Sequence, residues 1–169
     1  LYWMQQAQRT CYNHALEYAI RAGNDRGLPV VVVFGVTDDY PEANERHYAF
    51  LLEGLKDVAE ALKRRQIRFV LRHDAPDGAA LSLAQDAALL VMDRGYLRIQ
   101  KQWRDRVASG APCGVVQVET DVVVPVEVAS DKEAYPDVLL MDEPLGFIRA
   151  DNMGAFARSF AVEVHEKIL

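Results

Sequence analysis

The apolar residues of this chain fall into short, β-branched runs separated by segments with a helical period. The clearest run is Val30–Phe34, which follows Pro29 and has the continuous apolar character of a strand buried on both faces. Similar runs occur at Leu1–Met4, Ile67–Leu71, Ala88–Met92 and Gly114–Val118. The sequence therefore predicts five strands.

Between these runs the apolar positions recur every three or four residues, which is the spacing of a helix lying on a sheet. In residues 44–66, Leu51, Leu55, Val58 and Leu62 form one such stripe. Further helices are predicted at 11–22, 77–86, 97–109 and 153–168, the last with Asn152 as N-cap. Alternating strands and helices form βαβ units. We expect an α/β fold with a five-stranded parallel Rossmann-like sheet and helices on both faces.

The pattern changes after Val118. Residues 1–120 are predicted to form the α/β domain, 121–151 a connector, and 152–169 a terminal amphipathic helix. A segment of that length without a sustained period is unusual inside a compact domain, so its apolar residues are expected to pack on something else. Leu1 lies inside a predicted strand, and we therefore expect the natural N-terminus to lie upstream.

The composition of the chain disfavours several classes of function. The chain has 169 residues, enough for one domain with a full core, and a formal charge of −6. That charge disfavours strong non-specific binding of nucleic acid. Cys11 and Cys113 lack disulfide or metal spacing and are interpreted as reduced thiols of a cytoplasmic protein. No apolar run approaches the roughly 20 residues of a membrane span.

Polar residues follow each predicted strand, at the edge where open parallel sheets bind ligands. These rim segments are residues 5–9, 37–39, 73–74, 93–96 and 119–121. Two interpretations stay open at this point. The segments are polar because loops are solvated, which the pattern alone favours, or they hold a polar planar ligand. Gln5–Arg9 poses this question most directly.

Familiar catalytic and phosphate-binding motifs do not occur in the sequence. GxGxxG, GxxxxGK[ST] and GxSxG are missing, and the four histidines have no metal-ligand spacing. Residues 94–106 carry five basic side chains around Trp103. They form either a basic helix face for a phosphate backbone or a solvated face with Trp103 turned to the sheet, and we favour the second.

Several motifs in order resemble class II cyclobutane pyrimidine dimer photolyases. The first are YWMQ and QR in residues 2–9, followed by N-x-A-L-x-Y-A in residues 13–19. The resemblance continues through VVFGV (32–36), R-H-x-x-F-x-L-x-G-L-K (46–56) and VPVEVASDKEAY (124–135). It covers roughly residues 1–135 and fades afterwards.

The resemblance implies the N-terminal antenna-type domain of a DNA repair photolyase. In that family this domain can hold a light-harvesting chromophore, a deazaflavin or a folate. FAD, the DNA contacts and the electron-transfer chemistry belong to a helical C-terminal domain absent from this chain. The parent enzyme would be a carbon–carbon lyase that repairs pyrimidine dimers in light, and this part alone would not be catalytic. The implied partners are the C-terminal domain and, only through the full-length protein, DNA; no membrane is involved. The isolated domain is expected either to be poorly soluble or to dimerise.

Topology together with the resemblance suggests which rim residues meet the chromophore. The candidates are Met4, Gln5, Arg9, Asp38, Arg46, His47, Asp93 and Arg94. Asp93 is expected to accept hydrogen bonds from ring N–H groups of a deazaflavin, and Arg9 or Arg46 to meet an acidic tail. Two alternatives are a stand-alone nucleotide-binding protein of the same topology, against which the missing Gly-rich loop counts, and an interaction module without enzymatic activity.

Overall fold

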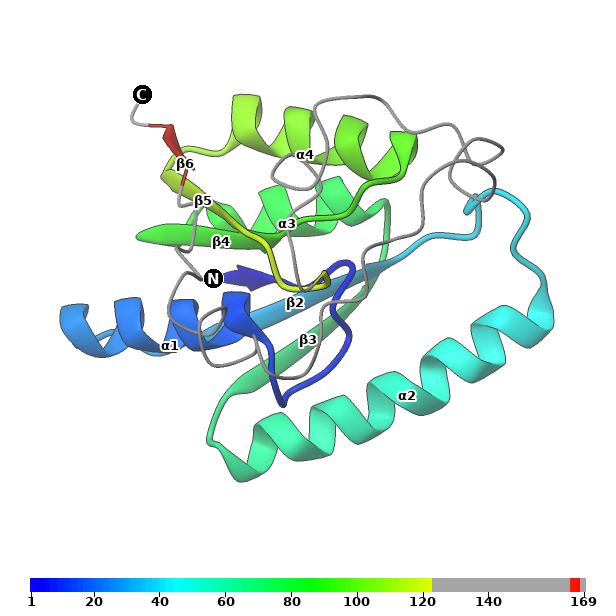
Figure 1. Cartoon of the computed structure of the whole chain (residues 1–169), viewed down its shortest axis with the longest axis horizontal. Helices are drawn as coiled ribbons and strands as arrows, with labels where there is room; N and C mark the ends of the chain where they lie inside the picture. The colour runs from blue at the N-terminus through cyan, green and yellow to red at the C-terminus, as the bar shows by residue number, and fades with distance from the viewer. Residues whose placement is uncertain (123–164, 168–169) are drawn as a thin grey trace, which may run out of the picture. The chain divides into compact units, whose positions relative to one another are not determined.

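In the computed structural model, the described residues are 1–122 and 165–167. Five strands alternate with four helices along the chain (Figure 1). The strands are β1 (Tyr2–Trp3), β2 (Val31–Val36), β3 (Arg68–His73), β4 (Leu89–Asp93) and β5 (Gly114–Val118). The helices are α1 (His14–Arg26), α2 (Glu45–Arg64), α3 (Pro76–Ala84) and α4 (Arg98–Gly110).

These five strands are parallel and occur in the sheet order β3-β2-β1-β4-β5. β1 lies in the middle, so that Trp3 is in register with Val33 of β2 and with Met92 of β4. The predicted five-stranded parallel sheet is therefore confirmed. Strand β3 lies at the edge, and all of its residues are exposed or half-buried, whereas its apolar character had indicated burial on both faces.

A sixth strand, β6 (His165–Lys167), pairs antiparallel with β5 and completes the order β3-β2-β1-β4-β5-β6. The predicted helix 153–168 is wrong at these three residues. The outer edge of β5 presents unpaired backbone N–H and C=O groups, and pairing with them satisfies the backbone of β6 as a strand. The rest of that predicted helix, and residues 123–151 of the predicted connector, lie outside the described residues.

Two separate cores lie on the two faces of the sheet. Tyr2 and Met4 point into the core formed with α1 and α2, whereas Trp3, between them, points into the core formed with α3 and α4. This alternation follows from the period of two along a strand. Helices on both faces are thus confirmed, and the stripe predicted for α2 buries Leu55, Val58 and Leu62 as expected.

Candidate functional site

The candidate site lies at the carboxyl ends of the central strands. β1 and β4 are neighbours in the sheet, but the helix that follows β1 packs on one face and the helix that follows β4 packs on the other. The loops after these strands therefore diverge and leave a crevice at the edge of the sheet. Open α/β sheets bind ligands in such crevices.

Asp93, the last residue of β4, holds the loop that follows β1. Its side chain is fully buried, and its two carboxylate oxygens accept hydrogen bonds from three consecutive backbone nitrogens. The distances are 2.9 Å from Gln5, 2.9 Å from Gln6 and 2.6 Å from Ala7. Complete burial raises the pKa of Asp93 to about 6, although the backbone donors lower it.

Asn13 fixes the same loop from the side of α1. Its side-chain oxygen accepts from the backbone nitrogen of Leu16 at 2.8 Å and so caps the helix. Its amide nitrogen donates to the carbonyl oxygens of Ala7, at 3.0 Å, and Arg9, at 2.9 Å. It also donates to the Tyr2 hydroxyl at 3.0 Å. The loop is thus anchored through both its N–H and its C=O groups.

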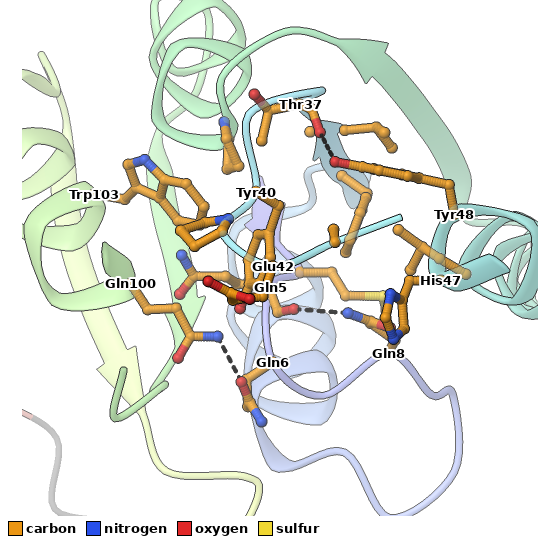
Figure 2. A pocket seen from close by; sticks show the side chains of 18 residues that line it. Gln5, Gln6, Gln8, Thr37, Tyr40, Glu42, His47, Tyr48, Gln100 and Trp103 are labelled. Carbon is orange, nitrogen blue, oxygen red and sulfur yellow. Dashed lines mark hydrogen bonds between the residues drawn. The ribbon is translucent and has the colours of Figure 1, made fainter. Parts of the chain in front are cut away.

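A cavity of about 600 Å³ opens beside this loop. Its lining comes from the loop after β1, the end of β2, the loop after β2, the start of α2, the first residue of α3 and the first two turns of α4. Figure 2 shows His47 and Tyr48 of α2 on the side opposite to Gln100 and Trp103 of α4, with Gln5 between them. The volume lies within the range of about 300–1,000 Å³ typical of small-molecule sites.

Aromatic side chains form much of the wall. The rings of Tyr40 and Trp103 have centroids 6.2 Å apart and are tilted by 50°. Tyr48 is fixed by a 2.8 Å hydrogen bond from its hydroxyl to the carbonyl oxygen of Thr37. Gly35 permits the close approach of α3, because a Cβ there would lie only 2.6 Å from the Cα of Pro76. This part of the wall is therefore largely aromatic and suited to a flat ring.

Glutamine side chains supply the polar part of the lining. The Gln100 amide nitrogen donates to the Gln6 side-chain oxygen at 2.6 Å, and the Gln100 oxygen accepts from the Leu97 backbone at 3.2 Å. Gln8 donates to the backbone oxygen of Gln5 at 3.1 Å. Gln5 itself is only 7% exposed, and neither polar atom of its side-chain amide has a hydrogen-bond partner among the described residues.

Three of the predicted site residues, Met4, Gln5 and His47, line this cavity. The other five do not line it in the part of the chain that the structure describes. Asp93 lies behind the loop, with its oxygens directed to backbone N–H groups instead of to the cavity. Arg9 donates to the carbonyl oxygen of Thr120 at 2.6 Å and pairs with Asp121 at 3.4 Å.

The remaining three lie at the surface or on another loop. Asp38 pairs with His73 at 2.9 Å, and both side chains are exposed. Arg46 is exposed in the first turn of α2. The Arg94 guanidinium lies 5.5 Å from the ring centroid of Tyr96. Sequence position placed all three at the correct edge of the sheet, but not in the cavity.

The sequence had not indicated Tyr40, Tyr48, Gln100 or Trp103 as site residues. Their only signal was an aromatic or amide side chain near the end of a strand or the start of a helix. Trp103 is buried and turned to the sheet, as the favoured interpretation of residues 94–106 required. Arg104 is also buried, and it donates to the carbonyl oxygen of Gly95 at 2.5 Å. Burial, together with the neighbouring charge of Arg94, lowers the pKa of Arg104.

Two further observations concern the described residues. They contain no group of His, Cys, Asp and Glu side chains that would hold a metal ion. Within the same residues, every helix is too short or too polar to cross a membrane.

Comparisons with known proteins agree on one family. The family model described as DNA photolyase matches residues 1–140. A deoxyribodipyrimidine photo-lyase of Methanothermobacter thermautotrophicus is 53% identical over 135 residues, which cover 80% of this chain and 30% of that protein. A deoxyribodipyrimidine photo-lyase of Potorous tridactylus is 35% identical over 139 residues, covering 80% of this chain and 26% of the relative. The chain thus spans less than a third of the length of these relatives.

Among solved structures, the chain is similar to a universal stress protein family member from Burkholderia pseudomallei. The TM-score is 0.45 at 24% sequence identity, and the match covers 69% of this chain and 92% of that one.

Proposed function

This chain belongs to the DNA photolyase family as an N-terminal domain. From that premise we propose that it is the chromophore-holding domain of a class II deoxyribodipyrimidine photolyase. Such an enzyme repairs pyrimidine dimers in DNA in light. The observation that carries the chromophore assignment is the aromatic-walled cavity at the carboxyl ends of β1 and β2. Class II is proposed from the YWMQ and QR motifs of residues 2–9.

The lining suits a deazaflavin or a folate. Both ligands carry a flat heterocycle, which the Tyr40 and Trp103 rings can contact, and a polar edge, which a side-chain amide can bind. An antenna chromophore held by these residues would supply light absorption, and its excitation would be passed to the flavin of the enzyme. The residues of this chain bind the ring, orient it through the loop anchored by Asp93 and Asn13, and exclude water from it.

Flavin and DNA are proposed to bind elsewhere in the parent protein. The relatives extend well beyond the matched segment, which is less than a third of their length. We place FAD, the DNA contacts and the bond-breaking step in that further part, and we propose that this part is the partner of the present domain. The chain alone is then a light-collecting module without lyase activity.

Fluorescence titration tests the chromophore assignment. 5-Deazariboflavin and folic acid, added separately to the purified chain, are expected to give saturable binding for at least one of them. Ala43→Trp places an indole at the cavity wall and should weaken that binding about tenfold or more. The matched control, Ala49→Trp, adds the same indole to an exposed position of α2 and should bind as the unchanged chain does.

A second measurement tests the proposed enzyme. The full-length protein encoded by the gene is expected to repair thymine dimers in an oligonucleotide only under illumination. Ala43→Trp in the full-length protein should reduce repair at the wavelengths that the antenna absorbs, and leave repair driven by flavin absorption unchanged. Absence of light-dependent repair by the full-length protein would contradict the photolyase assignment itself.

A further inference from the structure

The side-chain amide of Gln5 lacks the hydrogen bonds that a buried amide requires. Gln5 is 7% exposed, and both its Nε2 and its Oε1 are shielded from water and unpartnered in the described part of the chain. Burying an amide without hydrogen-bond partners in apolar surroundings is unfavourable. Since most buried polar side chains are hydrogen-bonded, such an exception calls for a partner that enters from outside.

The backbone of Gln5 is held so that the amide stays at the cavity. Its backbone nitrogen donates to Asp93 at 2.9 Å, and its carbonyl oxygen accepts from the Gln8 side chain at 3.1 Å. Gln5 also lines the cavity between α2 and α4 (Figure 2). These two bonds fix the backbone of Gln5 beside the cavity.

The neighbouring glutamine side chains are hydrogen-bonded to groups other than the Gln5 side-chain amide. Gln100 bonds through its oxygen to Leu97 and through its nitrogen to Gln6. The Gln8 nitrogen is already bonded to the Gln5 carbonyl oxygen. Of the glutamines that line the cavity, Gln5 is the one whose two side-chain atoms are both unbonded within the described residues.

The charge of the lining limits what the ligand can be. Among the described residues that line the cavity there is no Lys or Arg, and the ionisable side chains include Glu42 and His47. A phosphate group therefore finds no counter-charge there. A carboxamide presents one donor beside one acceptor, which matches a ring that carries an N–H next to a C=O, as in a lactam or an imide.

We propose that Gln5 selects the ligand of this cavity by pairing its amide with the lactam or imide edge of a planar heterocycle. Nε2 donates to the ring carbonyl oxygen, and Oε1 accepts from the adjacent ring N–H. This inference rests on the proposed function. It adds which edge of the ligand the site recognises and which residue recognises it. A site built around such a pair rejects an analogue that lacks the N–H, because the buried amide is then left unpaired.

The test compares two probes and two variants in the whole chain. The probes are 5-deazariboflavin, whose ring N3–H lies between two carbonyl groups, and its 3-methyl derivative, in which a methyl group replaces that hydrogen. The unchanged chain is expected to bind 5-deazariboflavin about 10- to 100-fold more tightly than the 3-methyl derivative. Folic acid, which carries a lactam edge, is titrated alongside.

Gln5→Leu is expected to bind the two deazariboflavins with equal, weakened affinity. Gln102→Leu makes the same change at an exposed position of α4 outside the cavity lining, and it should keep the preference. Circular dichroism of each variant checks that the fold is retained.

Each outcome separates the inference from the proposed function. Tight binding of both deazariboflavins by the unchanged chain, or a preference that survives Gln5→Leu, overturns the role of Gln5 while the chromophore site stands. No binding of 5-deazariboflavin or folic acid overturns the chromophore site and this inference together. A preference lost only in Gln5→Leu supports both.

Discussion

The carboxylate of Asp93 lies 2.6 Å from the backbone nitrogen of Ala7 and joins the end of β4 to the loop that follows β1. The two residues are far apart in sequence, and their contact closes one side of the crevice between the diverging loops. The same carboxylate also accepts from the backbone of Gln5, so the position of the proposed selective residue depends on it. Asp93, which the sequence suggested as a chromophore-binding residue, thus anchors the loop after β1.

The stability of the protein should depend on Asn13. Asn13→Ala removes the N-cap of α1 and the donor to the carbonyl oxygens of Ala7 and Arg9. We expect a loss of about 2–4 kcal/mol in the free energy of unfolding, since a cap and buried hydrogen bonds are lost together. Urea denaturation measures this. Asn24→Ala, at an exposed position of the same helix, should change stability by less than about 0.5 kcal/mol.

The buried Asp93 should give a specific pH dependence. Its pKa is raised from 3.8 to about 6 in the folded protein by burial. The folded state therefore binds more protons than the unfolded state between these values. The resulting stabilisation is fully present below about pH 4 and is lost as the pH rises through about 6, with a size of about 3 kcal/mol.

Asp93→Asn isolates that contribution. The free energy of unfolding of the wild type, minus that of Asp93→Asn, should decrease as the pH rises from 4 to 7, whatever its sign at pH 7. A carboxyl carbon resonance with a midpoint near pH 6 should accompany it in the wild type. Asp39→Asn, at an exposed position, is the control and should leave the slope unchanged. A slope of opposite sign would show that the backbone donors outweigh burial.

Replacing Gln5 should raise stability while it impairs recognition. Gln5→Leu substitutes an apolar side chain of similar size for an unpartnered buried amide. The expected gain in the free energy of unfolding is about 1–2 kcal/mol without ligand. Thermal and urea unfolding of the ligand-free protein measure it. A loss of stability on this substitution would mean that the amide has a partner, such as a bound water, in solution.

Two glycines should respond in opposite directions to the same substitution. In Gly35→Ala the added Cβ would lie 2.6 Å from the backbone Cα of Pro76, which cannot move aside easily. We expect a loss of about 1–3 kcal/mol and a distorted cavity wall. In Gly54→Ala the Cβ meets nothing within 4 Å, at an exposed position of α2. There the higher helix propensity of alanine should add about 1 kcal/mol. Equal effects at the two positions would contradict the close approach of α3.

Much of the fold was readable from the sequence because its signals are local. The continuous β-branched run at Val30–Phe34 is typical of a buried strand, and the apolar stripe of residues 44–66 has the period of a helix. Their alternation then leaves few topologies, and a parallel sheet with helices on both faces is the simplest. β6 was not readable, since whether His165–Lys167 form a strand depends on the free edge of β5.

The candidate site was readable only in outline. The polar rim residues could be located from the sequence, because strand ends in a parallel sheet meet at one edge. Which of them face the cavity depends on contacts between distant parts of the chain. Asp93 turns to backbone N–H groups and Arg9 to Thr120 and Asp121 after β5, whereas Gln5 lines the cavity with its amide unpaired within the described residues. A buried polar side chain forms hydrogen bonds with the groups that lie next to it in the folded protein, and those groups come from distant parts of the chain.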